Sequence, residues 1–405
     1  MPTNSDFLLW ELNRETTLSN KLKIYLIAGE PSGDALGARL MRAMKKKTDN
    51  NVEFFGVGGE TMESEGFNSL FDISDLAVMG LAEVIPSIPK VLKRINQTTD
   101  DILKIKPDVV VTIDSWSFGS RVQKKLRAKK TGIPQIHYVA PQVWAWKKKR
   151  ARTMYKYVDH LMTLLPQEPK YFTPYGLNTT FVGHPVIESP VACGNKENFR
   201  TKYNVPADKR IVCILPGSRH NEVASLLPTF IETAKKLFAQ FDDLFFVIPT
   251  VKTVEKRVKE MTANCGLPLL IVEGSEDRHN AMCASSAAIA ASGTVALELA
   301  IADVPHIVGY KVSKLTALMA KKLLHIQFVN LSNILLGREV VPELLQDACE
   351  PNNIAMHIRR FLTQDDLYRH QMDGLAKVRK VLGLGEQTPS EKACDVILDV
   401  INQKS

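Results

Sequence analysis

Short apolar runs alternate with amphipathic helical patterns along most of this 405-residue chain. The first run, 22–28, precedes a helical pattern over 35–47 in which Leu36, Leu40 and Met44 share one face. Such alternation is typical of an α/β protein whose parallel sheet is covered on both faces. Similar runs predict further strands at 52–56, 109–113, 135–140, 160–165, 211–215, 244–248, 269–272, 287–291 and 306–310.

A segment flanked by Gly and Pro, near 181–186, separates two such series. We therefore expect two doubly wound, Rossmann-like domains that face each other across a cleft. The predicted bounds are 21–185 for the N-terminal domain and 186–375 for the C-terminal domain, followed by C-terminal helices at 376–405. The last helix carries an apolar stripe that must dock on the first domain or on a partner chain, which allows a homodimer. The stripe consists of Ala393, Val396, Ile397, Val400 and Ile401.

The net charge of +8 is compatible with an anionic partner, such as nucleic acid, a phosphorylated substrate or an acidic membrane surface. The six cysteines have no C-x-x-C spacing, so neither a metal site nor a disulfide framework is expected. No signal-peptide pattern and no 18-residue apolar run is evident. We expect a cytoplasmic protein that is soluble or lies on a membrane surface.

Two turns in the second half have the character of anion-binding sites. Gly217-Ser218-Arg219 follows the apolar run 211–215, and Ser292-Gly293-Thr294 stands between the run 287–291 and a helical pattern. Exposed backbone N–H groups, a helix start and a guanidinium suit a nucleotide diphosphate. Glu298, one helical turn after Thr294, suits a ribose diol. The alternative is that both are ordinary strand-to-helix turns with Ser and Thr as caps.

Further along, a helix that begins near Pro342 would place Glu343 and Gln346 on one face. An exposed, polar helix start is the alternative interpretation.

In the first half, the turn 29–37 follows a strand but matches neither a phosphate-binding Walker loop nor a dinucleotide fingerprint. Its Glu30 and Asp34 would repel a phosphate, so the turn suggests an acceptor for sugar hydroxyls or a capped, tightly packed turn. Asp114 ends the run 109–113. There it is either a general base toward an alcohol or a helix cap.

Two more segments have several interpretations. The density of apolar residues between Phe71 and Leu92 indicates either a lid or acyl-chain groove, or a buried helix pair. Trp144 and Trp146 precede the basic cluster 147–152. That combination would suit single-stranded nucleic acid, an anionic lipid interface, or a core loop followed by a solvated helix.

Several of these runs, in the same order, resemble the lipid-A-disaccharide synthase family. The resemblance extends from about Lys23 to Gln346 and rests on 28–34, 76–80, 143–146, 215–219, 291–294 and 333–346. It implies a GT-B type glycosyltransferase that needs no cofactor or metal and acts peripherally at the inner face of the bacterial inner membrane. Its donor would be UDP-2,3-diacylglucosamine and its acceptor 2,3-diacylglucosamine 1-phosphate. The products would be the β-1,6-linked disaccharide 1-phosphate and UDP.

The resemblance also implies roles for individual residues. Asp114 would help to deprotonate the acceptor 6-hydroxyl, and Arg219 would stabilise the leaving diphosphate. Met79 would contact acyl chains or the membrane. The remaining substrate-binding residues would be Glu30, Ser32 and Asp34 beside the acceptor, Gly217, Ser218, Ser292, Gly293 and Thr294 at the phosphates, Glu298 at the ribose, and Asn333, Glu339, Glu343 and Gln346 on the donor side.

The chain departs from the family at one place. The family usually reads Ile-Asp-Ala-Pro-Asp-Phe, whereas 113–118 reads Ile-Asp-Ser-Trp-Ser-Phe, so Ser117 replaces a second carboxylate. The competing interpretations are another UDP-GlcNAc enzyme (a 2-epimerase or the peptidoglycan GlcNAc transferase) and a non-catalytic nucleic-acid-binding protein. Recognised nucleic-acid motifs are absent, so we expect no nucleic-acid partner.

Overall fold

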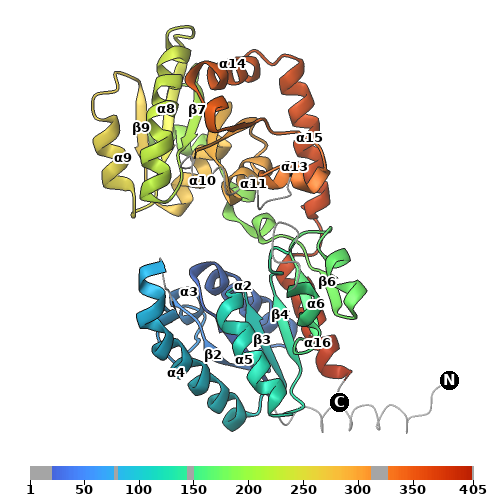
Figure 1. The fold of residues 1–405 in the computed structure, drawn as a ribbon. Helices are drawn as coiled ribbons and strands as arrows, with labels where there is room; N and C mark the ends of the chain where they lie inside the picture. The colour runs from blue at the N-terminus through green and yellow to red at the C-terminus, as the bar shows by residue number, and fades with distance from the viewer. Residues whose placement is uncertain (1–20, 77–80, 144–149, 312–326, 404–405) are drawn as a thin grey trace, which may run out of the picture. The chain divides into compact units, whose positions relative to one another are not determined.

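The computed structural model describes residues 21–76, 81–143, 150–311 and 327–403. The chain forms two compact units (Figure 1): the first contains residues up to Gly183 together with those from Gln387 onward, and the second spans His184–Glu386. The C-terminal boundary predicted after residue 375 falls inside a helix, α15 (Asp366–Leu382), which belongs to the second unit. The segment 376–405 is therefore divided between the two units.

The first unit is built on a parallel sheet with the strand order β2-β1-β3-β4-β5-β6. Its strands are β1 (Leu22–Ala28), β2 (Val52–Val57), β3 (Val109–Ile113), β4 (Gln135–Tyr138), β5 (His160–Thr163) and β6 (Asn178–Phe181). Its helices are α2 (Pro31–Lys47), α3 (Glu60–Glu63), α4 (Leu81–Ile105), α5 (Trp116–Ala128), α6 (Ala151–Met154) and α16 (Pro389–Asn402).

Alternate side chains of each central strand enter two separate cores. On β1, Ile24 and Leu26 pack in the core that α2 and α16 cover, whereas Tyr25 and Ile27 pack in the core formed with α4 and α5. The strands are therefore apolar on both faces, as the continuous apolar runs predicted.

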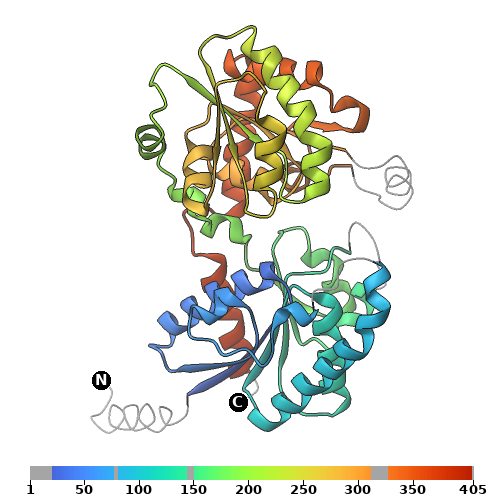
Figure 2. The same cartoon turned by 90° about the vertical axis from the view of Figure 1, so that its left-hand side faces the viewer.

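The last helix, α16, returns to the first unit, where Figures 1 and 2 show it, in red, beside blue and teal elements. Thr388 caps it: the Thr388 hydroxyl accepts from the Glu391 N–H, and the Glu391 carboxylate accepts from the Thr388 N–H. Ala393 and Ile397 of the apolar stripe are fully buried in the core shared with α2. The stripe thus packs on the first unit of its own chain.

The second unit repeats the architecture with the strand order β12-β11-β10-β7-β8-β9. Its strands are β7 (Arg210–Leu215), β8 (Leu244–Pro249), β9 (Leu269–Val272), β10 (Ala287–Ala291), β11 (His306–Tyr310) and β12 (Glu343–Leu345). Its helices are α7 (Lys196–Lys202), α8 (His220–Phe238), α9 (Glu255–Thr262), α10 (Ser275–Cys283), α11 (Thr294–Ile301), α13 (Leu331–Leu336), α14 (Pro351–Leu362) and α15.

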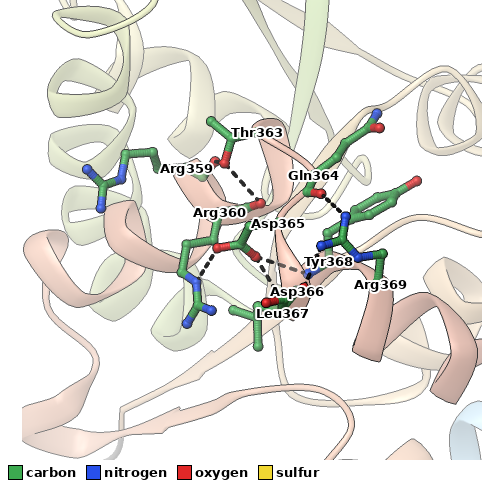
Figure 3. Close-up of polar contacts among 9 residues, drawn as sticks. All are labelled: Arg359, Arg360, Thr363, Gln364, Asp365, Asp366, Leu367, Tyr368 and Arg369. Carbon is green, nitrogen blue, oxygen red and sulfur yellow. Dashed lines mark hydrogen bonds and ion pairs between the residues drawn. The ribbon is translucent and has the colours of Figure 1, made fainter.

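The turn from α14 to α15 is fixed by polar contacts, which Figure 3 shows. Asp365 Oδ1 accepts from the Leu367 N–H at 2.7 Å, and its Oδ2 accepts from Arg360 Nε at 2.6 Å. Asp365 thereby caps α15 and ties it to the end of α14. The bond from Arg360 also lowers the pKa of the Asp365 carboxyl below its usual value.

The predicted helix at Pro342 is wrong, because residues 343–345 form β12 instead. Val308 N donates to the Pro342 carbonyl at 3.0 Å, and β12 pairs in parallel with β11. Proline, which has no N–H to offer, is tolerated at the start of an edge strand. Glu343 and Gln346 therefore share no helix face.

Within the described residues, no helix has both the length and the apolar character needed to cross a membrane.

Candidate functional site

Each sheet has one place where the strand order reverses, and the candidate residues gather there. In the first unit β1 lies between β2 and β3, and in the second unit β7 lies between β8 and β10. Parallel sheets bind ligands beyond the carboxyl ends of their strands at such switch points. The turns after β1 and β3, and those after β7 and β10, are the ones that the sequence singled out.

At the first switch point the structure brings Glu30, Ser32 and Asp114 together. Ser32 Oγ donates to Asp114 Oδ2 at 2.6 Å. Asp114 has a φ of 56°, which is uncommon for a residue other than glycine. Its N–H donates to the Tyr138 carbonyl at 2.9 Å, so β4 helps to hold this conformation. Strain of this kind is concentrated at active sites.

The surroundings of Glu30 disfavour its charged form. Burial, and then the nearby Asp114 carboxylate, raise the pKa of Glu30 above its ordinary value. Within the described part of the chain neither side chain forms a salt bridge, and Asp114 does not cap α5, whose N-cap residue is Ser115. A carboxylate in this position is able to accept a proton from a hydroxyl group.

A cavity of about 1190 Å³ opens beside this pair, entirely within the first unit. Glu30 and Ser115 line it at the sheet, and Ser117 and Arg121 line it from α5. The dense apolar segment of the sequence contributes much of the remaining wall, namely Phe71, Ile73, Leu76, Val91 and Leu92. A cavity that joins carboxylates to an apolar wall suits a sugar with hydrocarbon chains.

Asp34 also lines the cavity, but its carboxylate is buried and already bonded. Its Oδ1 accepts from the Gly59 N–H at 2.7 Å and the Met62 N–H at 3.1 Å, and its Oδ2 accepts from the Thr61 N–H at 2.8 Å. Asp34 therefore holds the start of α3 against α2. The packed-turn interpretation describes Asp34 better than a sugar-binding role does.

At the second switch point, Gly217 has a φ of 110° and an added Cβ would lie 2.5 Å from Glu222 Oε2. Glu222 was not singled out by the sequence analysis. Its Oε2 accepts from the Ser218 and Arg219 N–H groups at 3.1 and 3.3 Å, and Arg219 Nη1 donates to its Oε1 at 2.7 Å. A carboxylate thus already occupies donors of this turn, while the Arg219 side chain stays 79% exposed.

The second turn of this unit carries Ser292, Gly293 and Thr294 ahead of α11, and Gly293 and Thr294 are exposed. Glu298 lies on α11 one turn later and is paired with Arg278 of α10. His279 Nε2 lies 4.0 Å from Glu298 Oε1. Arg278 neutralises Glu298, which removes part of the repulsion that this carboxylate would exert on a diphosphate.

The segment after residue 330 is held by Asn333, whose side chain is fully buried. Asn333 Oδ1 accepts from the Val340 and Val341 N–H groups, and its Nδ2 donates to the Val341 carbonyl and to Glu343 Oε1. Glu343 also accepts from the Val329 and Asn330 N–H groups, each at 2.9 Å.

Asn333 and Glu343 therefore stabilise this loop by hydrogen bonds within it. Their polar atoms are already bonded, which disfavours the predicted contacts with a sugar-nucleotide donor. Glu339 lies on an exposed loop, and Gln346 follows β12 at the carboxyl edge of the sheet. Met79, Trp144, Trp146 and Lys147–Lys149 lie outside the described residues.

Sequence reasoning missed Glu222, Arg278, Ser115 and Arg121. Glu222 stands three residues after Arg219, a capping-box spacing that could have revealed it. Arg278 and Glu298 belong to different helices, so no local pattern links them. Among the described residues no group of His, Cys, Asp and Glu has the geometry of a metal site.

Solved structures with low sequence identity share this fold. A putative UDP-N-acetylglucosamine 2-epimerase from Listeria monocytogenes is 15% identical, with a TM-score of 0.63 over 95% of this chain and 96% of that one. Acinetobacter baumannii MurG is 14% identical, with a TM-score of 0.54 over 95% of this chain and 99% of that one. They place the two units in the GT-B fold class.

Sequence comparisons are more specific. A family model described as lipid-A-disaccharide synthetase matches residues 24–397. The lipid-A-disaccharide synthase of Paramagnetospirillum magneticum is 47% identical over 94% of this chain and 98% of its own length. That of Gluconobacter oxydans is 41% identical over 94% of this chain and 91% of its own length. With the switch-point residues in place, these matches show that the chain belongs to the lipid-A-disaccharide synthase family.

Proposed function

We propose that the protein joins UDP-2,3-diacylglucosamine to 2,3-diacylglucosamine 1-phosphate, with inversion at the anomeric carbon. The products are the β-1,6-linked disaccharide 1-phosphate and UDP. The observation that carries this proposal is that Glu30 and Asp114, which have no cationic partner among the described residues, lie beside a partly apolar cavity. The acceptor is an acylated sugar with a hydroxyl to deprotonate, and this cavity matches both parts of it.

The first unit binds the acceptor in this proposal. The acyl chains lie against the apolar wall that includes Phe71 and Leu92, and the sugar lies toward Glu30 and Asp114. Ser32, whose hydroxyl donates to Asp114, orients that carboxylate. Met79 is proposed to contact acyl chains or lipid.

The second unit binds UDP. Arg219 and the turns 217–218 and 292–294 bind the diphosphate, and Glu298 binds the ribose hydroxyls. The diphosphate replaces the Glu222 carboxylate as the partner of Arg219, because guanidinium binds phosphate oxygens as a fork. Glu339 and Gln346 are proposed to lie on the donor side, whereas Asn333 and Glu343 hold that loop in place.

The chemical step is a single displacement. Asp114 takes the proton of the acceptor 6-hydroxyl while that oxygen bonds to the anomeric carbon of the donor, and the bond from this carbon to the UDP oxygen breaks on the opposite face. The leaving diphosphate takes the electron pair, and Arg219 and the amino end of α11 stabilise its charge electrostatically. The protein's own cations thus do the work for which other glycosyltransferases use a metal.

We propose that the reaction takes place at the cytoplasmic face of the bacterial inner membrane, where the enzyme binds peripherally. The net charge of +8 favours an anionic lipid surface. Acylated substrates would enter the cavity from that surface.

The test is product formation from both substrates in detergent, with EDTA present, followed by mass spectrometry. A disaccharide 1-phosphate with one equivalent of UDP supports the donor, the acceptor and metal independence together. Proton NMR of the new linkage distinguishes inversion from retention. UDP binding without any disaccharide would reject the proposal and direct attention to other UDP-sugars.

A further inference from the structure

The cavity of the first unit has strongly unequal charges. Its acidic lining residues are Glu30, Asp34, Glu60, Glu63 and Asp72, whereas Arg121 is the one cationic side chain among the described residues that line it. A ligand that carries a phosphate group would be repelled by most of this wall. Such a ligand needs a cation within the cavity, and Arg121 is the candidate that the described lining residues offer.

The Arg121 side chain is held toward the amino end of α5. Its Nη1 donates to the Ser117 carbonyl at 2.7 Å, one helical turn back, and Ser117 itself lines the cavity. In the described part of the chain the other N–H groups of this guanidinium have no protein acceptor. The planar fork that binds a phosphate group is therefore available.

A hydroxyl group supports the same position. Ser115 is only 9% exposed, it lines the cavity, and its hydroxyl has no hydrogen-bond partner among the described residues, so it can donate to a ligand in the cavity. Asp114 directly precedes Ser115, but the first turn of α5 itself contains no acidic residue, and the exposed N–H groups of that turn favour an anion.

The uncharged residue at position 117 explains why Arg121 is available. An Asp at position 117 would stand four residues before Arg121, which is the favourable spacing for an ion pair on a helix. With Ser117 in its place, Arg121 has no carboxylate partner among the described residues.

We propose that Arg121, with the Ser115 hydroxyl and the amino end of α5, binds the phosphate group of the phosphorylated acyl-sugar. This inference rests on the proposed function, because it assigns a position to the acceptor's phosphate. It makes Arg121 a specificity-determining residue that distinguishes the phosphorylated lipid from the same lipid without phosphate.

The test compares two lipids in neutral detergent micelles, 2,3-diacylglucosamine 1-phosphate and 2,3-diacylglucosamine. Equilibrium binding to the full-length protein is measured for the parent and for Arg121→Gln. We expect the variant to bind the phosphorylated lipid about tenfold more weakly, and to bind the other lipid as the parent does. Arg121→Lys should recover part of the preference. Equal losses for both lipids, or no loss for the phosphorylated one, would overturn the proposal.

Position 117 provides a matched pair of variants. Ser117→Asp should weaken binding of the phosphorylated lipid because the new carboxylate pairs with Arg121, whereas the uncharged Ser117→Asn should not. Lys124→Gln removes a cation from the same helix outside the cavity and should leave the preference intact. Loss of the preference in Ser117→Asn or Lys124→Gln would count against the assignment.

Two competition experiments distinguish the phosphate of the acyl-sugar from free phosphate and from lipid headgroups. Inorganic phosphate should compete only weakly, because it lacks the contacts of the sugar and acyl chains. Micelles that contain phosphatidylglycerol should not displace the phosphorylated acyl-sugar from the parent, and displacement at similar lipid concentrations would mean that Arg121 contacts a membrane surface instead.

Turnover of the parent, measured alongside, separates this inference from the proposed function. Disaccharide formation with no effect of Arg121→Gln would reject the inference alone. Phosphate-dependent lipid binding through Arg121 without disaccharide formation would reject the proposed reaction and keep the binding site.

Discussion

The carboxyl edges of the two sheets share a topology but differ in how their carboxylates are neutralised. At the first edge, Glu30 and Asp114 lie near each other, and within the described residues neither has a cationic partner. At the second edge two carboxylates are each paired with an arginine: Glu222 with Arg219, and Glu298 with Arg278. The first arrangement favours proton acceptance and the second favours anion binding. In the proposed function, one architecture therefore performs two different chemical tasks.

The largest effect is expected at the unpaired edge. Asp114→Asn should lower kcat/KM by at least about a hundredfold, because general-base catalysis typically contributes that much or more. UDP affinity should stay unchanged, since we assign UDP to the other unit. Steady-state kinetics and equilibrium UDP binding provide the two readouts.

Asp72→Asn is the matched control for Asp114→Asn, because Asp72 is an exposed carboxylate that lines the cavity next to Asp114. Its activity should be close to that of the parent. Full turnover in Asp114→Asn would show that another group is the base.

The next effect is expected at the paired edge. Arg219→Gln should weaken UDP binding by about ten- to a hundredfold, because charge-assisted hydrogen bonds to the diphosphate are lost. Isothermal titration with UDP measures this change. Part of the loss comes from the Glu222 carboxylate left without its partner, so Arg219→Gln with Glu222→Gln should bind UDP better than the single variant. Unchanged affinity in Arg219→Gln would remove it from the diphosphate site.

A smaller effect is expected from Arg278→Gln, which leaves Glu298 without its cation. The free carboxylate then repels the diphosphate, and we expect UDP affinity to fall by up to about tenfold. Lys202→Gln, which breaks a pair with the neighbouring Asp277 on α10, serves as the control and should have little effect. If both variants weakened UDP binding equally, the cause would be damage to α10 and not the charge of Glu298.

The smallest effect concerns pH. Burial, and then the nearby Asp114 carboxylate, raise the pKa of Glu30, so this carboxyl becomes protonated at a higher pH than an ordinary glutamate. Asp114→Asn removes the neighbouring charge, so the pKa of Glu30 should fall toward its ordinary value. NMR titration of the side-chain carboxyls, with the Glu30 signal assigned through Glu30→Gln, measures this change. Asp72→Asn, at an exposed position that lines the cavity, should not move the pKa of Glu30, and an upward shift in Asp114→Asn would contradict the coupling.

Many strands of the fold could be predicted from the sequence because each is a continuous apolar run of neighbouring residues. The run 22–28 was predicted with the bounds that β1 has, as were 109–113 for β3 and 287–291 for β10. The edge strand β12 was not predicted. It has only three residues, and its pairing with β11 outweighs the helical pattern of the residues after Pro342.

The turns 217–219 and 292–294 were predicted as anion sites because glycine, hydroxyl and arginine follow apolar strands directly. The structure places both turns at the carboxyl ends of β7 and β10, and their role stays a prediction. Local spacing could not show that Asp34 accepts hydrogen bonds from the start of α3. Nor could it show that the Asn333 side chain is fully hydrogen-bonded to neighbouring residues of its own loop. Both conclusions require backbone N–H groups that other segments bring close.

The sequence by itself determined where strands end and which chemical groups stand at those ends, because both depend on neighbouring residues. Only the tertiary structure decided which of these groups remain available to a ligand. Arg278 comes from another helix to neutralise Glu298, whereas Glu30 and Asp114, beside a cavity built from distant segments, have no cationic partner in the described part of the chain. Charge neutralisation acts through space and not along the chain, so the local sequence pattern does not contain it.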